Sequence, residues 1–209
     1  MLVIFQGYDR CMRSVDGLCG AAIVARAGSV ALELAAGLAG AEAGAMCTPQ
    51  TRFQVASVSK QFVAAAVMLL AESGMVALGE PVDRWLPGSQ WRRVTLHHLL
   101  THTSGIGHWG DAPGFDPAQP MYPDDRLALI EQAPLRTEPG TRWHYSSPGY
   151  LLAGQIVARA SGRPYADFVT ERILDPLELT STTAGSVPLQ RGHRARLPRP
   201  RSGTVMGSE

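Results

Sequence analysis

The sequence predicts an α/β fold in which antiparallel strands come before a set of helices. The first observation is a pair of apolar, partly β-branched runs, Gly20–Ala27 and Val30–Leu38, separated by Gly28-Ser29. Glycine at the first of two turn positions is typical of a type II′ hairpin. The second observation is that the longer runs after this pair consist of helix-forming residues. We therefore expect a small antiparallel sheet followed by helices.

The clearest helical run is Val58–Ser73. It is rich in alanine and other helix formers, and Gly74 follows it as a natural C′ residue. Because the run is apolar nearly all round, we expect this helix to be buried.

The next stretch, from Pro81 to Pro123, is rich in proline and glycine and is expected to be mostly loop lining a cleft. It leaves room for a short helix around Leu96 to Thr101. After it, Asp124 is placed to cap a helix through Leu127 to Gln132.

A better helix begins at Ser147-Pro148, with serine as N-cap, proline at the first helical position and Gly162 after the end. Pro164 opens a further helix through Tyr165 to Leu174. Beyond Gly185 the sequence is rich in proline and arginine and loses periodicity. We expect one domain over residues 1–187 and a flexible tail over residues 188–209.

Composition supports a globular domain and excludes some partners. The 209 residues are 45% hydrophobic and 18% charged, with a net charge of +1, so the whole chain gives no reason to expect nucleic acid as a partner. The segment from Gln190 to Glu209 holds five arginines and one glutamate. An interaction module that binds acidic partners through this tail is a weaker alternative function.

Targeting and metal signals are absent from the sequence pattern. Met1–Phe5 is too short for the core of a secretory signal, and no run approaches the ~18 apolar residues of a membrane span. Cys11, Cys19 and Cys47 are irregularly spaced and form no CxxC pair, which indicates neither a disulfide framework nor a zinc site.

The strongest chemical signal is the S-x-x-K pattern of Ser57 and Lys60 at the start of the long helix. Residues three apart on a helix share a face, so the lysine lies one turn from the serine. A serine hydroxyl becomes a good nucleophile when a neighbouring base takes its proton, and a lysine amine serves as that base when its pKa is lowered.

Lys60 is the only lysine in the chain, since the other 18 basic side chains are arginine. Arginine does not give up its proton at working pH, so a site that needs a base cannot use the residue that this chain prefers elsewhere. The composition therefore favours a chemical role for Lys60.

A second signal is Tyr145-x-Ser147, placed just before a predicted helix N-terminus. In that order, Ser57-x-x-Lys60 and Tyr145-x-Ser147 resemble the motifs of the serine β-lactamases and penicillin-recognising hydrolases, especially the branch of class C β-lactamases, D-Ala-D-Ala carboxypeptidases and related esterases. The Leu99–Gly105 segment, LLTHTSG, resembles that branch too.

The resemblance implies an α/β fold of the serine β-lactamase type, with an antiparallel sheet packed by helices and a helical region. It implies that Ser57 is the nucleophile, Lys60 its base and Tyr145 a second proton-transfer residue, with Ser147 contacting substrate. The substrate would be a small or peptide-like molecule with an ester, amide or lactam carbonyl, and no metal or cofactor is implied.

The chain departs from the family pattern in two places. Ser147 stands where the family has asparagine, so recognition of a substrate amide is weakened. The family's third motif, on a later sheet strand, is not recognisable, and we expect the later strands to be missing. Two alternatives follow: a truncated product with little function, or a catalytically weak homologue that binds ligands. Unpaired strands would also favour self-association.

Overall fold

The structure, a computed structural model, describes residues 2–5, 20–39, 44–87, 91–116 and 123–184. These residues form two compact units that divide between Ala56 and Ser57: a sheet unit before this point and a helical unit after it. The predicted boundary between the domain and its tail, at residues 187 and 188, lies outside the described residues, as does the arginine-rich tail.

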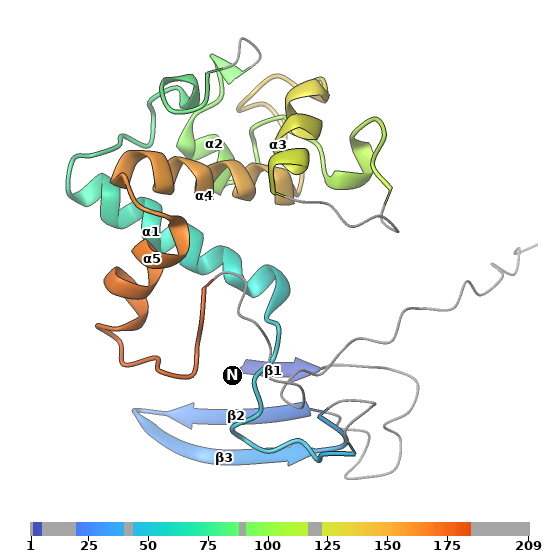
Figure 1. Cartoon of the computed structure of the whole chain (residues 1–209), viewed down its shortest axis with the longest axis vertical. Helices are drawn as coiled ribbons and strands as arrows, with labels where there is room; N and C mark the ends of the chain where they lie inside the picture. Colours follow the sequence, from blue (N-terminus) through green and yellow to red (C-terminus); the bar gives the residue numbers. More distant parts are fainter. Residues whose placement is uncertain (1, 6–19, 40–43, 88–90, 117–122, 185–209) are drawn as a thin grey trace, which may run out of the picture. The chain divides into compact units, whose positions relative to one another are not determined.

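The sheet unit contains three antiparallel strands in the order β1-β2-β3, namely β1 (Leu2–Phe5), β2 (Gly20–Arg26) and β3 (Ser29–Ala36). Figure 1 shows the three strands as neighbouring arrows. The hairpin predicted from the two apolar runs is confirmed as β2 and β3. Strand β1 was not expected from the sequence.

The predicted hairpin turn is wrong by one residue. Arg26 pairs with Ser29, so the two central turn residues are Ala27 and Gly28 and not Gly28 and Ser29. Both have positive φ, 49° and 78°, as a type I′ turn requires and a type II′ turn does not. Since Ser29 takes part in the ladder, it is unavailable to the turn.

Several apolar side chains of this sheet are exposed: Val30 is 57% exposed, Leu32 46% and Ile23 40%. Exposed apolar groups on a strand favour association with another surface. The self-association expected from the sequence stays a prediction.

The helical unit follows Ser57 and contains most of the described helices. A helical turn, η1 (Ala56–Ser59), leads into the first helix. The remaining elements, in chain order, are α1 (Lys60–Glu72), η2 (Val82–Arg84), α2 (Leu96–Leu100), η4 (Trp109–Asp111), α3 (Pro123–Gln132), α4 (Ser147–Ser161), α5 (Tyr165–Val169) and the π-helical turn η5 (Thr170–Leu174).

Helices α1 and α4 pack against each other, and Figure 1 shows them crossing within the helical unit. Their contact buries Val67 and Leu70 of α1 and Leu152 and Ile156 of α4 in the main core. Because α4 carries Tyr145 and Ser147 at its entrance, this packing positions the beginning of α4 relative to the beginning of α1.

The expectation that α1 is buried on all sides is wrong in this structure. Its buried residues, Ala66, Val67 and Leu70, lie on one face, whereas Met68 is 50% exposed. Apolar composition alone does not specify which helix positions are covered, because that depends on what packs against each face.

The other predicted helices are confirmed with shifted ends. Helix α2 lies where a short helix was expected, and α3 begins at Pro123, before Asp124. The predicted helix after Pro164 becomes α5 and then a π-helical turn, η5.

No helix of the described residues is long and apolar enough to span a bilayer. Cys47 is a buried free thiol, while Cys11 and Cys19 lie outside the described residues.

Candidate active site

The site begins at the entrance to α1. Ala56 has a φ of +43°, an uncommon value for a residue with a side chain, and the helical turn η1 starts there. Ser57 is exposed in this turn, and Lys60, three residues later, is partly buried. The Lys60 Nζ donates to the Ser57 Oγ over 3.5 Å, so the predicted one-turn spacing brings these two groups together.

The second part of the site lies at the entrance to α4. The sequence predicted Ser147 as the N-cap, but the cap is Ser146, whose Oγ accepts the Gly149 N–H over 2.9 Å. Ser146 is buried and also donates from its Oγ to the Gly107 carbonyl over 3.0 Å. Because Ser146 caps the helix, the Ser147 hydroxyl is available for other contacts.

Four side chains meet where these two helix entrances approach each other. The Tyr145 hydroxyl donates to the Ser57 Oγ over 2.7 Å, and the Lys60 Nζ donates to the Ser147 Oγ over 3.1 Å. We call Ser57, Lys60, Tyr145 and Ser147 the reactive cluster. All four candidate site residues expected from the sequence are therefore brought together, although 87 and 88 residues separate the bonded partners.

The electrostatics of the cluster centre on Tyr145. Hydrogen bonding with Lys60, then with Ser57 and Ser147, lowers the pKa of the Tyr145 hydroxyl, against the opposing effect of partial burial. The Lys60 Nζ also lies 4.9 Å from the centre of the Tyr145 ring. Among the ion pairs of the described residues, none includes Lys60. The nearest partners of this lysine are therefore hydroxyl groups.

His102 contacts the Tyr145 ring and the backbone of the residues on either side of it. Its backbone has a φ of +59°, its carbonyl accepts the His144 N–H over 2.8 Å, and its Nδ1 accepts the Ser146 N–H over 3.2 Å. The imidazole ring lies 4.7 Å from the Tyr145 ring. Burial and the nearby Lys60 lower the pKa of His102, which favours the neutral ring that accepts this hydrogen bond. His102 thus links the LLTHTSG segment to the residues on either side of Tyr145.

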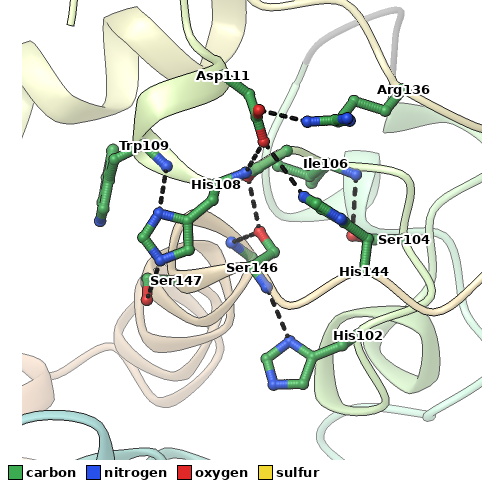
Figure 2. A network of polar contacts seen from close by, with 12 residues as sticks. His102, Ser104, Ile106, His108, Trp109, Asp111, Arg136, His144, Ser146 and Ser147 are labelled. Carbon is green, nitrogen blue, oxygen red and sulfur yellow. Dashed lines mark hydrogen bonds and ion pairs between the residues drawn. The ribbon is translucent and has the colours of Figure 1, made fainter. Parts of the chain in front are cut away.

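Asp111 forms a second anchor, shown in Figure 2. Its carboxylate accepts the His108 N–H over 2.7 Å, pairs with Arg136 and lies 3.2 Å from the His144 Nε2. The His108 N–H, and after it the Arg136 guanidinium, lower the pKa of Asp111 to about 2. The carboxylate therefore stays ionised. It holds both His108 and His144, the residue that precedes Tyr145.

These anchors form a supporting network, which we define as His102, His108, Asp111, His144 and Ser146 (Figure 2). Sequence reasoning assigned a role in the site to none of its members. The available signal was indirect: the LLTHTSG segment ends at Gly105, Ile106 and Gly107 follow it, and His108 comes next; glycines so placed let backbones approach closely.

The described residues contain no group of three or more histidine, cysteine or acidic side chains arranged to hold a metal ion. The reactive cluster itself offers two serine hydroxyls, a phenol and an amine. This donor set is suited to nucleophilic and proton-transfer chemistry.

Comparison with known proteins identifies the family. The model of the family described as Beta-lactamase matches residues 8–208. Esterase EstB of Burkholderia gladioli is 39% identical over 189 residues, which cover 81% of this chain and 48% of that protein.

Solved structures have the same fold. The penicillin-binding protein of Bacillus halodurans aligns with a TM-score of 0.75 at 28% identity, covering 85% of this chain and 57% of the other. EstCE1, described as a hydrolase with promiscuous acyltransferase activity, aligns with a TM-score of 0.65 at 27% identity, covering 76% and 46%. The chain spans about half the length of these relatives. The fold predicted from the resemblance is confirmed, and the chain belongs to the beta-lactamase family.

Proposed function

We propose that this chain carries the acyl-accepting site of a serine hydrolase, in which a carbonyl compound transfers its acyl group to Ser57. One observation supports this most strongly: the Tyr145 hydroxyl and the Lys60 amine, from two different helix entrances, both contact the Ser57 Oγ. A serine with two proton-transfer groups in contact is equipped for nucleophilic attack.

Lys60 acts as the base in the attack. In its neutral amine form, its lone pair accepts the Ser57 hydroxyl proton, while one of its N–H groups bonds to the Ser147 Oγ. The Ser57 oxygen then bonds to the substrate carbonyl carbon and forms a tetrahedral oxyanion. Among the described residues the Lys60 Nζ contacts the Ser57 and Ser147 hydroxyls and forms no ion pair, so its hydrogen-bond partners are groups that can exchange a proton.

Tyr145 acts as the acid when the intermediate collapses. Its hydroxyl gives a proton to the leaving oxygen or nitrogen as the bond to the carbonyl carbon breaks, and the Lys60 ammonium returns a proton to Tyr145. A lowered pKa makes the phenol a stronger acid at neutral pH, which suits this step. Hydrolysis repeats the sequence with water as the nucleophile and Ser57 as the leaving group.

Esters are the preferred substrate class in this proposal. The Ser147 Oγ accepts from Lys60 and lies 3.4 Å from the His108 Nε2, and a serine lacks the reach and the carboxamide of the family's asparagine, so it is less suited to recognise a substrate amide. Two of the similar proteins are described as an esterase and as a hydrolase with acyltransferase activity, which supports the same choice.

The test is intact-mass measurement after incubation with p-nitrophenyl acetate, followed by peptide mapping. We expect one acetyl group on Ser57 and none in Ser57→Ala. Ser59→Ala is the matched control, since it removes a hydroxyl two residues away, and it should label like the parent. A label on Ser59, Ser104 or Ser146 would refute the assignment. A parallel incubation with a penicillin distinguishes a lactam substrate from an ester.

A further inference from the structure

His108 contacts two members of the reactive cluster. Its Nε2 lies 3.4 Å from the Ser147 Oγ, and its ring stacks on the Tyr145 ring with centroids 5.7 Å apart and planes 23° apart. Figure 2 shows the imidazole between the Trp109 backbone on one side and Ser147 on the other. Its position is thus defined relative to the tyrosine and to the hydroxyl that Lys60 binds.

The contact with Trp109 fixes which nitrogen of His108 carries the proton. The His108 Nδ1 accepts the Trp109 N–H over 2.8 Å, so Nδ1 presents a lone pair and has no hydrogen. A neutral imidazole has one N–H group, which must then be on Nε2. The Nε2–H therefore faces the Ser147 Oγ as a donor.

The Ser147 oxygen then accepts from two donors, and its own hydroxyl hydrogen is left to donate. Its oxygen accepts from Lys60 over 3.1 Å and from the His108 Nε2–H, and a hydroxyl oxygen has two acceptor positions. With both positions filled, the Ser147 hydroxyl hydrogen must point elsewhere. Hydrogen bonding by Ser147 is one of the causes that lower the pKa of Tyr145, as expected if this hydrogen faces the phenol.

Backbone contacts define the position of His108. Its N–H donates to Asp111, and the preceding residue is Gly107, where a Cβ would lie 2.8 Å from the Asp111 Cβ. The Gly107 carbonyl accepts from the buried Ser146. The imidazole is therefore anchored through its backbone on one side and through Nδ1 on the other.

We propose that His108 is a positioning residue of the acyl-transfer site, which orients the Ser147 hydroxyl beside the Lys60 amine by donating from Nε2 to the Ser147 Oγ. His108 and Ser147 thus act as a pair: His108 stacks on the Tyr145 ring and donates to the Ser147 hydroxyl. This inference rests on the proposed function, because it concerns the rate at which Ser57 is acylated.

The first test is a double-mutant cycle on the acylation rate constant, measured from the p-nitrophenol burst. His108→Phe keeps a ring against Tyr145 and removes both nitrogens, and Ser147→Ala removes the hydroxyl. Each change should slow acylation about tenfold, the equivalent of one net hydrogen bond of about 1.4 kcal/mol. If His108 acts through Ser147, the double variant should also lose about tenfold rather than about a hundredfold.

His108→Gln is the rescue variant, because its amide N–H can donate toward Ser147, and it should acylate faster than His108→Phe. Thermal unfolding of each variant verifies that the compared proteins are folded. Additive losses in the cycle, or equal rates for the glutamine and phenylalanine variants, would overturn the positioning role.

The second test does not depend on activity. Long-range proton–nitrogen spectra of the histidine rings report the tautomer, and the signal that disappears in His108→Phe identifies His108. We expect the Nε2–H form at a pH where the ring is neutral, and an Nδ1–H form would overturn the inference. A folded parent that is not acylated at Ser57 overturns the proposed function, and the positioning role with it, whereas the other outcomes concern His108 alone.

Discussion

The reactive cluster and the supporting network lie side by side but are held by different kinds of bond. In the reactive cluster the hydrogen bonds join side chains to one another, and Ser57 is exposed. In the supporting network most bonds join a side chain to a backbone group. Side chains that bond to each other can exchange protons, whereas side chains that bond to backbone fix the path of the chain. We therefore expect cluster substitutions to change the reaction and network substitutions to change stability.

The largest expected effect concerns Lys60. If Lys60 is the base, Lys60→Arg should acylate as poorly as Lys60→Ala, with a loss of about 10²–10⁴-fold in rate, because arginine keeps the charge and cannot accept a proton. The measurement is the rate of acetyl transfer to Ser57. Both variants should unfold at nearly the parent's urea concentration. Near-normal acylation by the arginine variant would show that Lys60 is not the base.

The next effect concerns Gly105, beside the supporting network. Gly105 has a φ of +78°, and a Cβ there would lie 2.1 Å from the Thr137 carbonyl oxygen. Gly105→Ala should therefore lower the free energy of unfolding by about 2–5 kcal/mol, from backbone strain and overpacking combined. Chemical denaturation measures the change.

Gly114→Ala is the matched control for Gly105→Ala. Gly114 has nearly the same φ, +79°, but nothing lies within 4 Å of its Cβ position. The loss should be about 1 kcal/mol, from backbone strain alone. Equal losses for the two glycines would show that close packing against Thr137 contributes little.

Neighbouring serines provide a smaller and more direct comparison. Ser146→Ala removes the α4 cap and leaves the Gly107 carbonyl without its donor, so the free energy of unfolding should fall by about 1–2 kcal/mol. Ser147→Ala should leave stability within about 0.5 kcal/mol of the parent and slow acylation instead. If Ser146→Ala slowed acylation and Ser147→Ala lowered the free energy of unfolding, the roles assigned to the two serines would be wrong.

The smallest effect concerns Asp111 and pH. The folded pKa of Asp111 is about 2, below the ordinary value of about 3.9, so its ionised form stabilises the fold. This contribution is fully present above about pH 4 and is lost as the pH falls toward about 2. Urea unfolding at pH 5 and pH 2.5 should show a larger loss for the parent than for Asp111→Asn. The same loss in both proteins would contradict this.

The four residues that the structure brings together could be predicted from sequence, Ser57 and Lys60 from residue type and short spacing and Tyr145 and Ser147 from the family resemblance. The S-x-x-K pattern identified Ser57 and Lys60, the single lysine supported it, and Tyr145-x-Ser147 supplied the remaining pair. The hairpin and the long helix could be predicted as well, because apolar runs and turn residues are local features. The exact turn at Ala27-Gly28 could not, because it depends on which residue across the ladder pairs with Arg26.

Tertiary structure alone decided how the cluster is held. Ser146 and Ser147 are adjacent and chemically identical, and no local rule distinguishes the cap from the residue that meets Lys60. The distinction comes from the Gly107 carbonyl, about 40 residues earlier in the chain. This carbonyl accepts a hydrogen bond from the buried Ser146, and Ser147 is left to contact Lys60. The short motifs did not identify His108 for the same reason. By itself the sequence determined which groups are available for the chemistry. The packing of distant segments determined where each hydroxyl and imidazole points, because long-range contacts select one arrangement among those that local preferences allow.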